Sequence, residues 1–262
     1  MLAPSSFRPG LSIGSFALAA LIGLGVPVGA YAATETQTVD KTVAIPAGGT
    51  LKVRNFSGKV EITGTDRTDV SLHAVRRASR ERLDRIKLDV QSDGDTVTIE
   101  ANKRTGPKME NDNVVETDMT IEVPRQVKLD IDVFSSEVTV RGVAGGQNRV
   151  KTFSGEITLE GVTGQVDAET FSGAIHASPV KWAAADTLRF HTFSGDIGVR
   201  VPAEANASVE FDSFSGDLQS DLPLTFRNKS KHNLKAELNS ADGPNSAQLT
   251  LKTFSGDVHI TK

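Results

Sequence analysis

Apolar and polar residues alternate along most of the chain, and the alternation repeats around one short motif. Phe-Ser-Gly occurs six times, and the variant Phe-Ser-Ser begins at Phe134. The six copies are Phe56-Ser57-Gly58, Phe153-Ser154-Gly155, Phe171-Ser172-Gly173, Phe193-Ser194-Gly195, Phe214-Ser215-Gly216 and Phe254-Ser255-Gly256. From Phe134 to Phe214 the motifs are 19, 18, 22 and 21 residues apart, which is typical of a solenoid. The interval of 40 residues to Phe254 fits two periods with one degenerate coil.

Columns at fixed distances from each Phe indicate that the period is structural. The residue three positions before each Phe is apolar: Val53, Ile131, Val150, Ala168, Phe190, Phe211 and Leu251. The residue four positions after it is also apolar: Val60, Val138, Ile157, Ile175, Ile197, Leu218 and Val258. Period-two alternation on both sides of the motif predicts two β-strands per copy. The sequence therefore predicts strands stacked in register around a continuous apolar interior.

The column two residues before the Phe alternates in charge in consecutive copies: Asp132, Lys151, Glu169, His191 and Asp212. Parallel strands lie about 4.8 Å apart, so like charges in one column would repel each other. Alternation therefore favours in-register stacking, although exposed pairs of this kind add little stability.

The motif itself predicts a corner between two strands. Glycine reaches positive φ without steric penalty, and a serine hydroxyl bonds readily to backbone groups in a turn. We therefore interpret the Phe-Ser-Gly copies as structural repeat corners. Strict alternation places the Phe on the outer face, whereas a bend before the corner turns it inward. We favour burial, because large rings usually fill protein cores.

The residues between the first and second copies have a different character. Alternating apolar residues predict strands around Val70–Ala74, Ile86–Val90, Val97–Ala101 and Met119–Val123, with a hairpin turn at Ser92–Asp95. We expect a small antiparallel cap at this end of the solenoid, because an open end exposes an unpaired strand edge.

Three further segments interrupt the strand pattern. Arg76–Arg85 is a basic cluster that could contact an anionic envelope polymer or lipid head group. Glu81 and Asp84 interrupt the cluster and favour a solvated helical turn. Thr105–Asn113 is predicted to be a loop, and Leu238–Leu249 a long hairpin before a last complete coil.

The first 32 residues have the features of an export signal. Arg8 precedes an apolar run, and Ala30-Tyr31-Ala32 is a small-x-small cleavage site. The run is short for a membrane anchor, and no stop-transfer charges follow it. We expect a signal peptide at 1–32, a strand-rich cap with the first repeat at 33–128, and solenoid repeats at 129–262. No transmembrane span is expected after cleavage, and the expected location is the periplasm, the cell surface or the medium.

Composition narrows the class of protein. Without Arg8, the chain carries 28 basic and 33 acidic side chains, a net charge of −5 that argues against a nucleic-acid partner. Cysteine is absent, so neither a disulfide framework nor a lipid-bearing cysteine is available. Trp182 is the one tryptophan, and so few amphipathic rings argue against a glycan-processing cleft.

No arrangement typical of catalysis or metal binding stands out. The repeated serines lack a Gly-x-Ser-x-Gly elbow, and a catalytic serine would not recur at every corner. Acidic residues follow the Phe by three positions in five copies: Glu137, Glu156, Asp196, Asp217 and Asp257. Because Ala174 interrupts this column, capping of turn amides is favoured over a cation site.

The histidines are scattered along the sequence: His73, His176, His191, His232 and His259. An approach of His176 and His191 on neighbouring coils would supply two metal ligands, whereas a site normally needs three or four. We therefore expect no catalytic residue, no bound metal and no cofactor.

The repeated units, together with the strand-rich opening "LKVRNFSGKVEITG" at 51–64, resemble the bacterial putative-adhesin family of unknown function. Members of that family carry repeated Ser-Gly-Asp β-strand units. The resemblance runs from about Val39 to Lys262 and implies a right-handed parallel β-helix in the cell envelope without catalytic residues.

These features predict an all-β, right-handed parallel β-helix (solenoid) with about 20 residues per coil. The expected function is that of an exported, non-enzymatic structural or adhesin-like protein whose partner is an unknown envelope polymer or protein. Two alternatives stay open. One is a polysaccharide-degrading β-helix enzyme, for which Asp196 and Asp217 are the carboxylates to test, and the other is an envelope-stress accessory protein.

Overall fold

The computed structural model describes residues 34–262 apart from 105–113, 179, 181, 184–185, 231 and 240–245. These residues form nineteen β-strands and one six-residue helix, so the prediction of an all-β protein is confirmed. The predicted signal peptide and the predicted loop Thr105–Asn113 lie outside the described residues. No helix in the described part of the chain is long and apolar enough to span a membrane.

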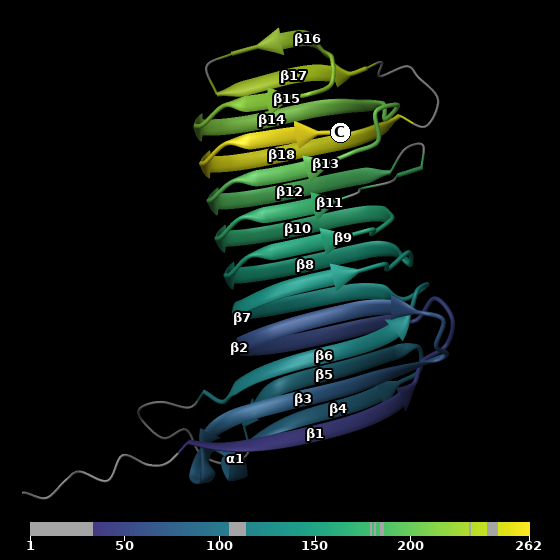
Figure 1. Ribbon diagram of the computed structural model, residues 1–262, viewed down its shortest axis with the longest axis vertical. Helices are drawn as coiled ribbons and strands as arrows, with labels where there is room; N and C mark the ends of the chain where they lie inside the picture. The colour runs from purple at the N-terminus through teal and green to yellow at the C-terminus, as the bar shows by residue number, and fades with distance from the viewer. Residues whose placement is uncertain are drawn as a thin grey trace, which may run out of the picture. The chain divides into compact units, whose positions relative to one another are not determined.

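Most strands form two parallel ladders that meet at the Phe-Ser-Gly corners (Figure 1). Before the corner, the strands lie side by side in the order β2 (Thr50–Thr65), β7 (Lys128–Arg141), β8 (Gly146–Ser154), β10 (Gly164–Ser172), β12 (Thr187–Ser194), β18 (Ala247–Ser255) and β14 (Ala207–Ser215). After the corner, the order is the second halves of β2 and β7, then β9 (Ile157–Glu160), β11 (Ile175–Ser178), β13 (Ile197–Arg200), β19 (Val258–Thr261) and β15 (Leu218–Ser220). We call the two strands that flank one corner a rung.

The apolar columns line the interior between the two ladders. Ile157, Ile175 and Ile197 are partners in adjacent strands and are fully buried. On the other side of the corner, Ala168 and Phe190 are likewise fully buried partners. Full burial of one large aliphatic or aromatic side chain contributes about 1.5–3 kcal/mol. In-register stacking around a continuous apolar core is therefore confirmed.

The residues between the first and second motifs form the N-terminal part of the described chain. Its elements are β1 (Thr34–Ala44), β3 (Asp69–Ser79), α1 (Arg80–Arg85), β4 (Ile86–Asp93), β5 (Thr96–Arg104) and β6 (Glu116–Pro124). β5 and β6 continue the parallel ladders on one side of β2. β3 pairs with β6, β1 with β3 and β4 with β5, all antiparallel. The four strands predicted here are confirmed, as is the turn between β4 and β5.

The basic segment Arg76–Arg85 is only partly helical. The helix spans Arg80–Arg85, whereas the first four residues of the segment continue β3. Arg76 is 2% exposed, and its guanidinium donates to the side chain of Gln37 and the carbonyl oxygen of Ile86. The prediction of a solvated helical turn is wrong for this part, because β1 pairs alongside it.

The last rung in the sequence is not the last rung in the stack. β18 pairs with β12 on one side and with β14 on the other, and β19 lies between β13 and β15 in the same way. The chain therefore skips one rung between β13 and β14 and fills that rung later with β18 and β19. The prediction that successive copies stack in chain order is wrong at this point, because copies with the same pattern and register fit any rung.

The residues between Phe214 and Phe254 do not form a degenerate coil. They contain β16 (Leu224–Lys229) and β17 (Asn233–Leu238), an antiparallel pair of which β17 also pairs with β14. The hairpin predicted at Leu238–Leu249 is wrong, because β17 and β18 lie on opposite sides of β14. Residues 240–245 of that segment lie outside the described residues.

Candidate functional site

Seven phenyl rings form one continuous row on the outer surface. In stacking order they are Phe56, Phe134, Phe153, Phe171, Phe193, Phe254 and Phe214. Neighbouring ring centroids are 4.7–5.0 Å apart, and neighbouring planes differ by 16° or less. The imidazole of His232 stacks on the Phe214 ring at 5.2 Å and extends the row. We call this row the Phe strip, and its seven steps of about 4.8 Å give it a length of about 34 Å.

The rings of the Phe strip face solvent, so the prediction that they are buried is wrong. Their exposed fractions range from 39% at Phe56 to 63% at Phe214. The physical reason is that the alternation of the strand continues up to the corner, so the residue before each Phe takes the inward position. Stacking between rungs then covers the ring faces, which makes an outward ring less costly.

Buried threonines occupy this inward position. Thr170 Oγ1 donates to the Gly155 carbonyl oxygen at 3.1 Å, and Thr192 Oγ1 donates to the Gly173 carbonyl oxygen at 3.0 Å. The equivalent bonds are made by Thr152 and Thr253. Each bond ties one rung to the corner of a neighbouring rung. Sequence analysis missed this role, although the Thr before the Phe in four copies was a visible signal.

The motif glycines lie where neighbouring rungs approach each other closely. Gly173 has φ 151° and Gly195 has φ 146°, in the region that favours glycine. A Cβ on Gly195 would lie 2.2 Å from the Gly173 carbonyl oxygen, and a Cβ on Gly173 would lie 2.1 Å from the Gly155 carbonyl oxygen. The same combination occurs at Gly58, Gly155, Gly216 and Gly256. The motif serines form a register row beside them: Ser57, Ser135, Ser154, Ser172, Ser194, Ser255 and Ser215.

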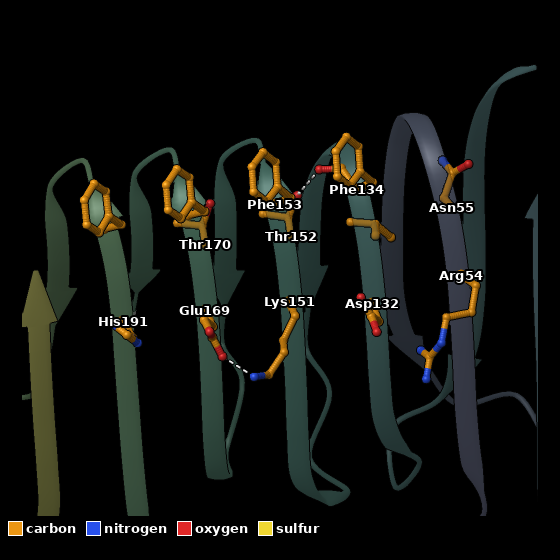
Figure 2. A pocket seen from close by; sticks show the side chains of 13 residues that line it. Arg54, Asn55, Asp132, Phe134, Lys151, Thr152, Phe153, Glu169, Thr170 and His191 are labelled. Carbon is orange, nitrogen blue, oxygen red and sulfur yellow. Dashed lines mark hydrogen bonds and ion pairs between the residues drawn. The ribbon is translucent and has the colours of Figure 1, made fainter. Parts of the chain in front are cut away.

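Charged side chains run beside the Phe strip, two residues earlier in each strand (Figure 2). In stacking order they are Arg54, Asp132, Lys151, Glu169, His191, Lys252 and Asp212, which we call the mixed-charge row. Lys151 forms an ion pair with Glu169, and its hydrogen bond lowers the pKa of the Glu169 carboxyl. Lys252 Nζ lies 2.9 Å from Asp212 Oδ2. The alternation therefore holds, except that Lys252, and not Asp212, follows His191.

The central part of the Phe strip, from Phe134 to Phe193 in stacking order, and the mixed-charge row from Arg54 to His191 border a groove of about 540 Å³. Figure 2 shows the rings of Phe134 and Phe153 on one side of the groove and Lys151 and Glu169 on the other. Thr152 also lines the groove. The groove is thus apolar along one side and carries charges of both signs along the other.

A second charged row lies on the far side of the corner, three residues after each Phe. In stacking order it contains Lys59, Glu137, Glu156, Ala174, Asp196, Asp257 and Asp217, and we call it the acidic row. Lys59 Nζ lies 3.1 Å from Glu137 Oε2. The Asp257 N–H donates to Asp196 Oδ1 at 2.8 Å, and the Asp217 N–H donates to Asp257 Oδ1 at 2.9 Å. Asp196 and Asp257 therefore accept bonds from corner amides, as predicted, whereas the Glu137 and Glu156 carboxylates contact side chains instead.

The residues considered for catalysis or metal binding are not gathered into one site. Asp257 lies between Asp196 and Asp217 in the acidic row. Among the residues that the structure describes, no group of three or more His, Cys, Asp or Glu could hold a metal ion. His176 lies after the corner and His191 before it, in different ladders, so the predicted approach of the two is wrong. The other histidines lie apart from them: His73 on β3, His232 between β16 and β17, and His259 on β19.

The sequence profile of the family described as Toastrack DUF4097 matches residues 126–261, which is just over half of the 262-residue chain. No curated protein matches the sequence.

Several solved structures are similar to the chain at low sequence identity. A putative cell adhesion protein from Clostridium sporogenes ATCC 15579 is 11% identical, with a TM-score of 0.48, over 86% of this chain and 99% of that one. A putative adhesin from Bacteroides fragilis NCTC 9343 is 14% identical, with a TM-score of 0.38, over 86% and 97% of the two chains. A putative adhesin from Parabacteroides merdae ATCC 43184 is 11% identical, with a TM-score of 0.25, over 87% and 97%.

Proposed function

The chain belongs to the Toastrack DUF4097 family, and from its exposed Phe strip we propose that it is an exported, non-catalytic, adhesin-like interaction protein of the bacterial envelope. The export signal predicted at residues 1–32 supports the compartment. The Phe strip supports the role, because a large exposed apolar patch is unfavourable in water and usually marks a surface that a binding partner covers.

The Phe strip is the single observation that carries the proposal. At about 200 Å² per phenylalanine side chain, exposed fractions near 45% leave about 90 Å² per ring and about 600 Å² in all. This area reaches the upper end of the range of about 300–600 Å² for the largest apolar patch on a soluble monomer. At about 25 cal/mol per Å², covering it would contribute about 15 kcal/mol before the costs of association. The strip is therefore large enough to be the main contact of a specific complex.

We also propose that the rungs wind as a right-handed parallel β-helix with about 20 residues per coil. The direct pairing of Ile157 with Ile175 and of Ile175 with Ile197 supports this period. Residues 33–128 then act as a cap with the first repeat, and residues 129–262 as the repeats. The antiparallel strands β1, β3 and β4 support the cap, because they cover edges that the parallel ladders would leave open.

The proposal is tested by capture from envelope extracts on three forms of the purified protein. These are the unchanged protein, Phe153→Ser/Phe171→Ser in the Phe strip, and Phe226→Ser as the matched control. Phe226 is 56% exposed but lies on β16, outside the strip. Circular dichroism verifies that each form is folded.

Retained proteins and polymers are quantified by mass spectrometry and carbohydrate analysis. We expect specific material on the unchanged protein and the control, reduced at least tenfold on the double variant. Equal capture by all three forms, or turnover of a glycan substrate by the purified protein, contradicts the proposal.

A further inference from the structure

The two flanks of the Phe strip differ in net charge. The mixed-charge row contains three basic residues, three acidic residues and His191, so it is close to neutral at pH 7. The acidic row contains five carboxylates and one lysine, Lys59, whose ammonium is already 3.1 Å from Glu137. A partner that lies along the strip therefore meets a balanced surface on one side and a negative surface on the other.

The rings of the strip present their edges to solvent. Because neighbouring centroids are only 4.7–5.0 Å apart and the planes are nearly parallel, each inner ring has both faces covered by its neighbours. Sugar rings recognised by aromatic stacking require open ring faces, so this arrangement disfavours a polysaccharide partner. Ring edges pack well against aliphatic side chains and against the faces of other aromatic rings. The exposed surface thus suits the side chains of a polypeptide.

We propose that the strip binds a cationic polypeptide segment, an inference that rests on the proposed function. The apolar side chains of the segment cover the Phe strip, and its Lys or Arg side chains lie along the acidic row. The acidic row repels a second copy of the same surface and an anionic membrane, whereas it attracts a basic segment. A helix of about 20 residues is about 30 Å long, close to the length of the strip. A basic amphipathic helix therefore matches the surface in length, polarity and charge.

At Glu137 and Glu156 of the acidic row, charge is removed without loss of a corner bond. The Asp196 and Asp257 carboxylates accept backbone amides and are left unchanged for this reason. Glu137 forms an ion pair with Lys59, and Glu156 accepts a bond from the hydroxyl of Thr158, so neither holds a backbone amide of a corner. Glu137→Gln/Glu156→Gln is therefore the test variant. The control is Glu61→Gln/Glu160→Gln, which removes two carboxylates further from the corner, one on β2 and one on β9.

The probe is a fluorescent 20-residue amphipathic peptide of Lys and Leu, compared with a peptide in which Glu replaces every Lys. Fluorescence anisotropy measures binding to the full protein at 50 and 500 mM NaCl. We expect the Lys-Leu peptide to bind at least tenfold more tightly than the Glu-Leu peptide at low salt, and salt to weaken that binding. Glu137→Gln/Glu156→Gln should weaken it about three- to tenfold. The control variant should stay within about twofold of the unchanged protein.

Each other outcome overturns a stated part of the reasoning. Equal binding of the two peptides overturns the cationic partner and leaves the proposed function standing. Full binding of the Lys-Leu peptide by Phe153→Ser/Phe171→Ser overturns the Phe strip as the binding surface, and the proposed function with it. If neither peptide binds, the cationic partner is overturned. Binding of phosphatidylcholine vesicles that is lost in Phe153→Ser/Phe171→Ser would then assign the strip to lipid. Dimerisation in sedimentation that is lost in the same variant would assign it to a second copy.

Discussion

Replacing Gly173 by alanine is expected to lower the free energy of unfolding by about 2–6 kcal/mol. Its φ of 151° costs a residue with a side chain about 1–3 kcal/mol. The added Cβ would also lie 2.1 Å from the Gly155 carbonyl oxygen, well inside contact distance. That oxygen accepts a hydrogen bond from the hydroxyl of Thr170, and the Gly155 amide donates to the Ser172 carbonyl oxygen, so relief requires the two rungs to separate. Overpacking of this kind costs about 1–3 kcal/mol more.

Gly161→Ala is the matched control. Gly161 has φ 62°, but no atom lies within 4 Å of the position that its Cβ would take. The expected loss is therefore about 1–2 kcal/mol, from conformation alone. The difference between the two variants isolates the close approach of the rungs.

Urea denaturation measures both variants, followed by circular dichroism and by the fluorescence of Trp182. Trp182 is partly buried, and its indole N–H donates to the Asn206 carbonyl oxygen at 3.2 Å, so its emission reports on folding. Coincident transitions by the two probes justify a single free energy of unfolding. Equal losses of unfolding free energy in the two variants would refute the close-approach argument. A loss below about 1 kcal/mol in Gly173→Ala would also refute the conformational cost assigned to its φ.

Three further substitutions probe the contacts around the corners. Thr170→Val should lower the free energy of unfolding by about 1 kcal/mol in urea, because the Gly155 carbonyl oxygen loses a donor. Phe171→Ala should lower it by about 2–4 kcal/mol, since about half of the ring is covered and two stacking contacts are lost. The hydrogen bond from Lys151 lowers the pKa of Glu169, so its stabilising effect is complete above the unfolded value of 4.5 and is lost as pH falls through the folded pKa. Glu169→Gln should therefore flatten that acid part of the profile of stability against pH.

Each of these predictions has a control on the same protein. Thr158→Val removes an exposed hydroxyl that bonds only to a nearby carboxylate, and it should change stability by less than about 0.5 kcal/mol. Phe226→Ala removes an exposed ring outside the strip and should have a similarly small effect. For Glu169→Gln the reference is the unchanged protein, measured over the same pH range. A control that equals its test variant contradicts the assigned contact.

The apolar interior was predictable because burial enforces a simple periodicity. A shift of one residue would move Ile157 or Ile175 from the core to solvent, so the alternating pattern fixes which face of each strand is inside. The same logic predicted the strands of the N-terminal part. Its limit is the corner, where the pattern alone does not say whether Phe153 continues the alternation or turns inward.

The outward rings and the order of the rungs depend on interactions between copies. An exposed Phe is unfavourable in a single rung and becomes acceptable only when Phe134 and Phe171 cover the faces of Phe153. The position of β18 could not be predicted from the sequence for a related reason. Every copy offers the same register and the same motif, so the sequence does not rank which copy lies beside β12. The position of β18 between β12 and β14 therefore depends on interactions among all the rungs.

The placement of β18 and β19 has a consequence for how the molecule is completed. Strands at the end of a chain usually fray and exchange their amide hydrogens quickly, but the amides of β18 lie between two partner strands, and Leu249 and Leu251 are fully buried. Slow hydrogen exchange is therefore expected there, comparable with that of the central rungs. If the chain folds in sequence order, the rungs cannot be added one after another along the stack. The neighbouring rungs β12–β13 and β14–β15 precede in the sequence the strands β18 and β19 that lie between them.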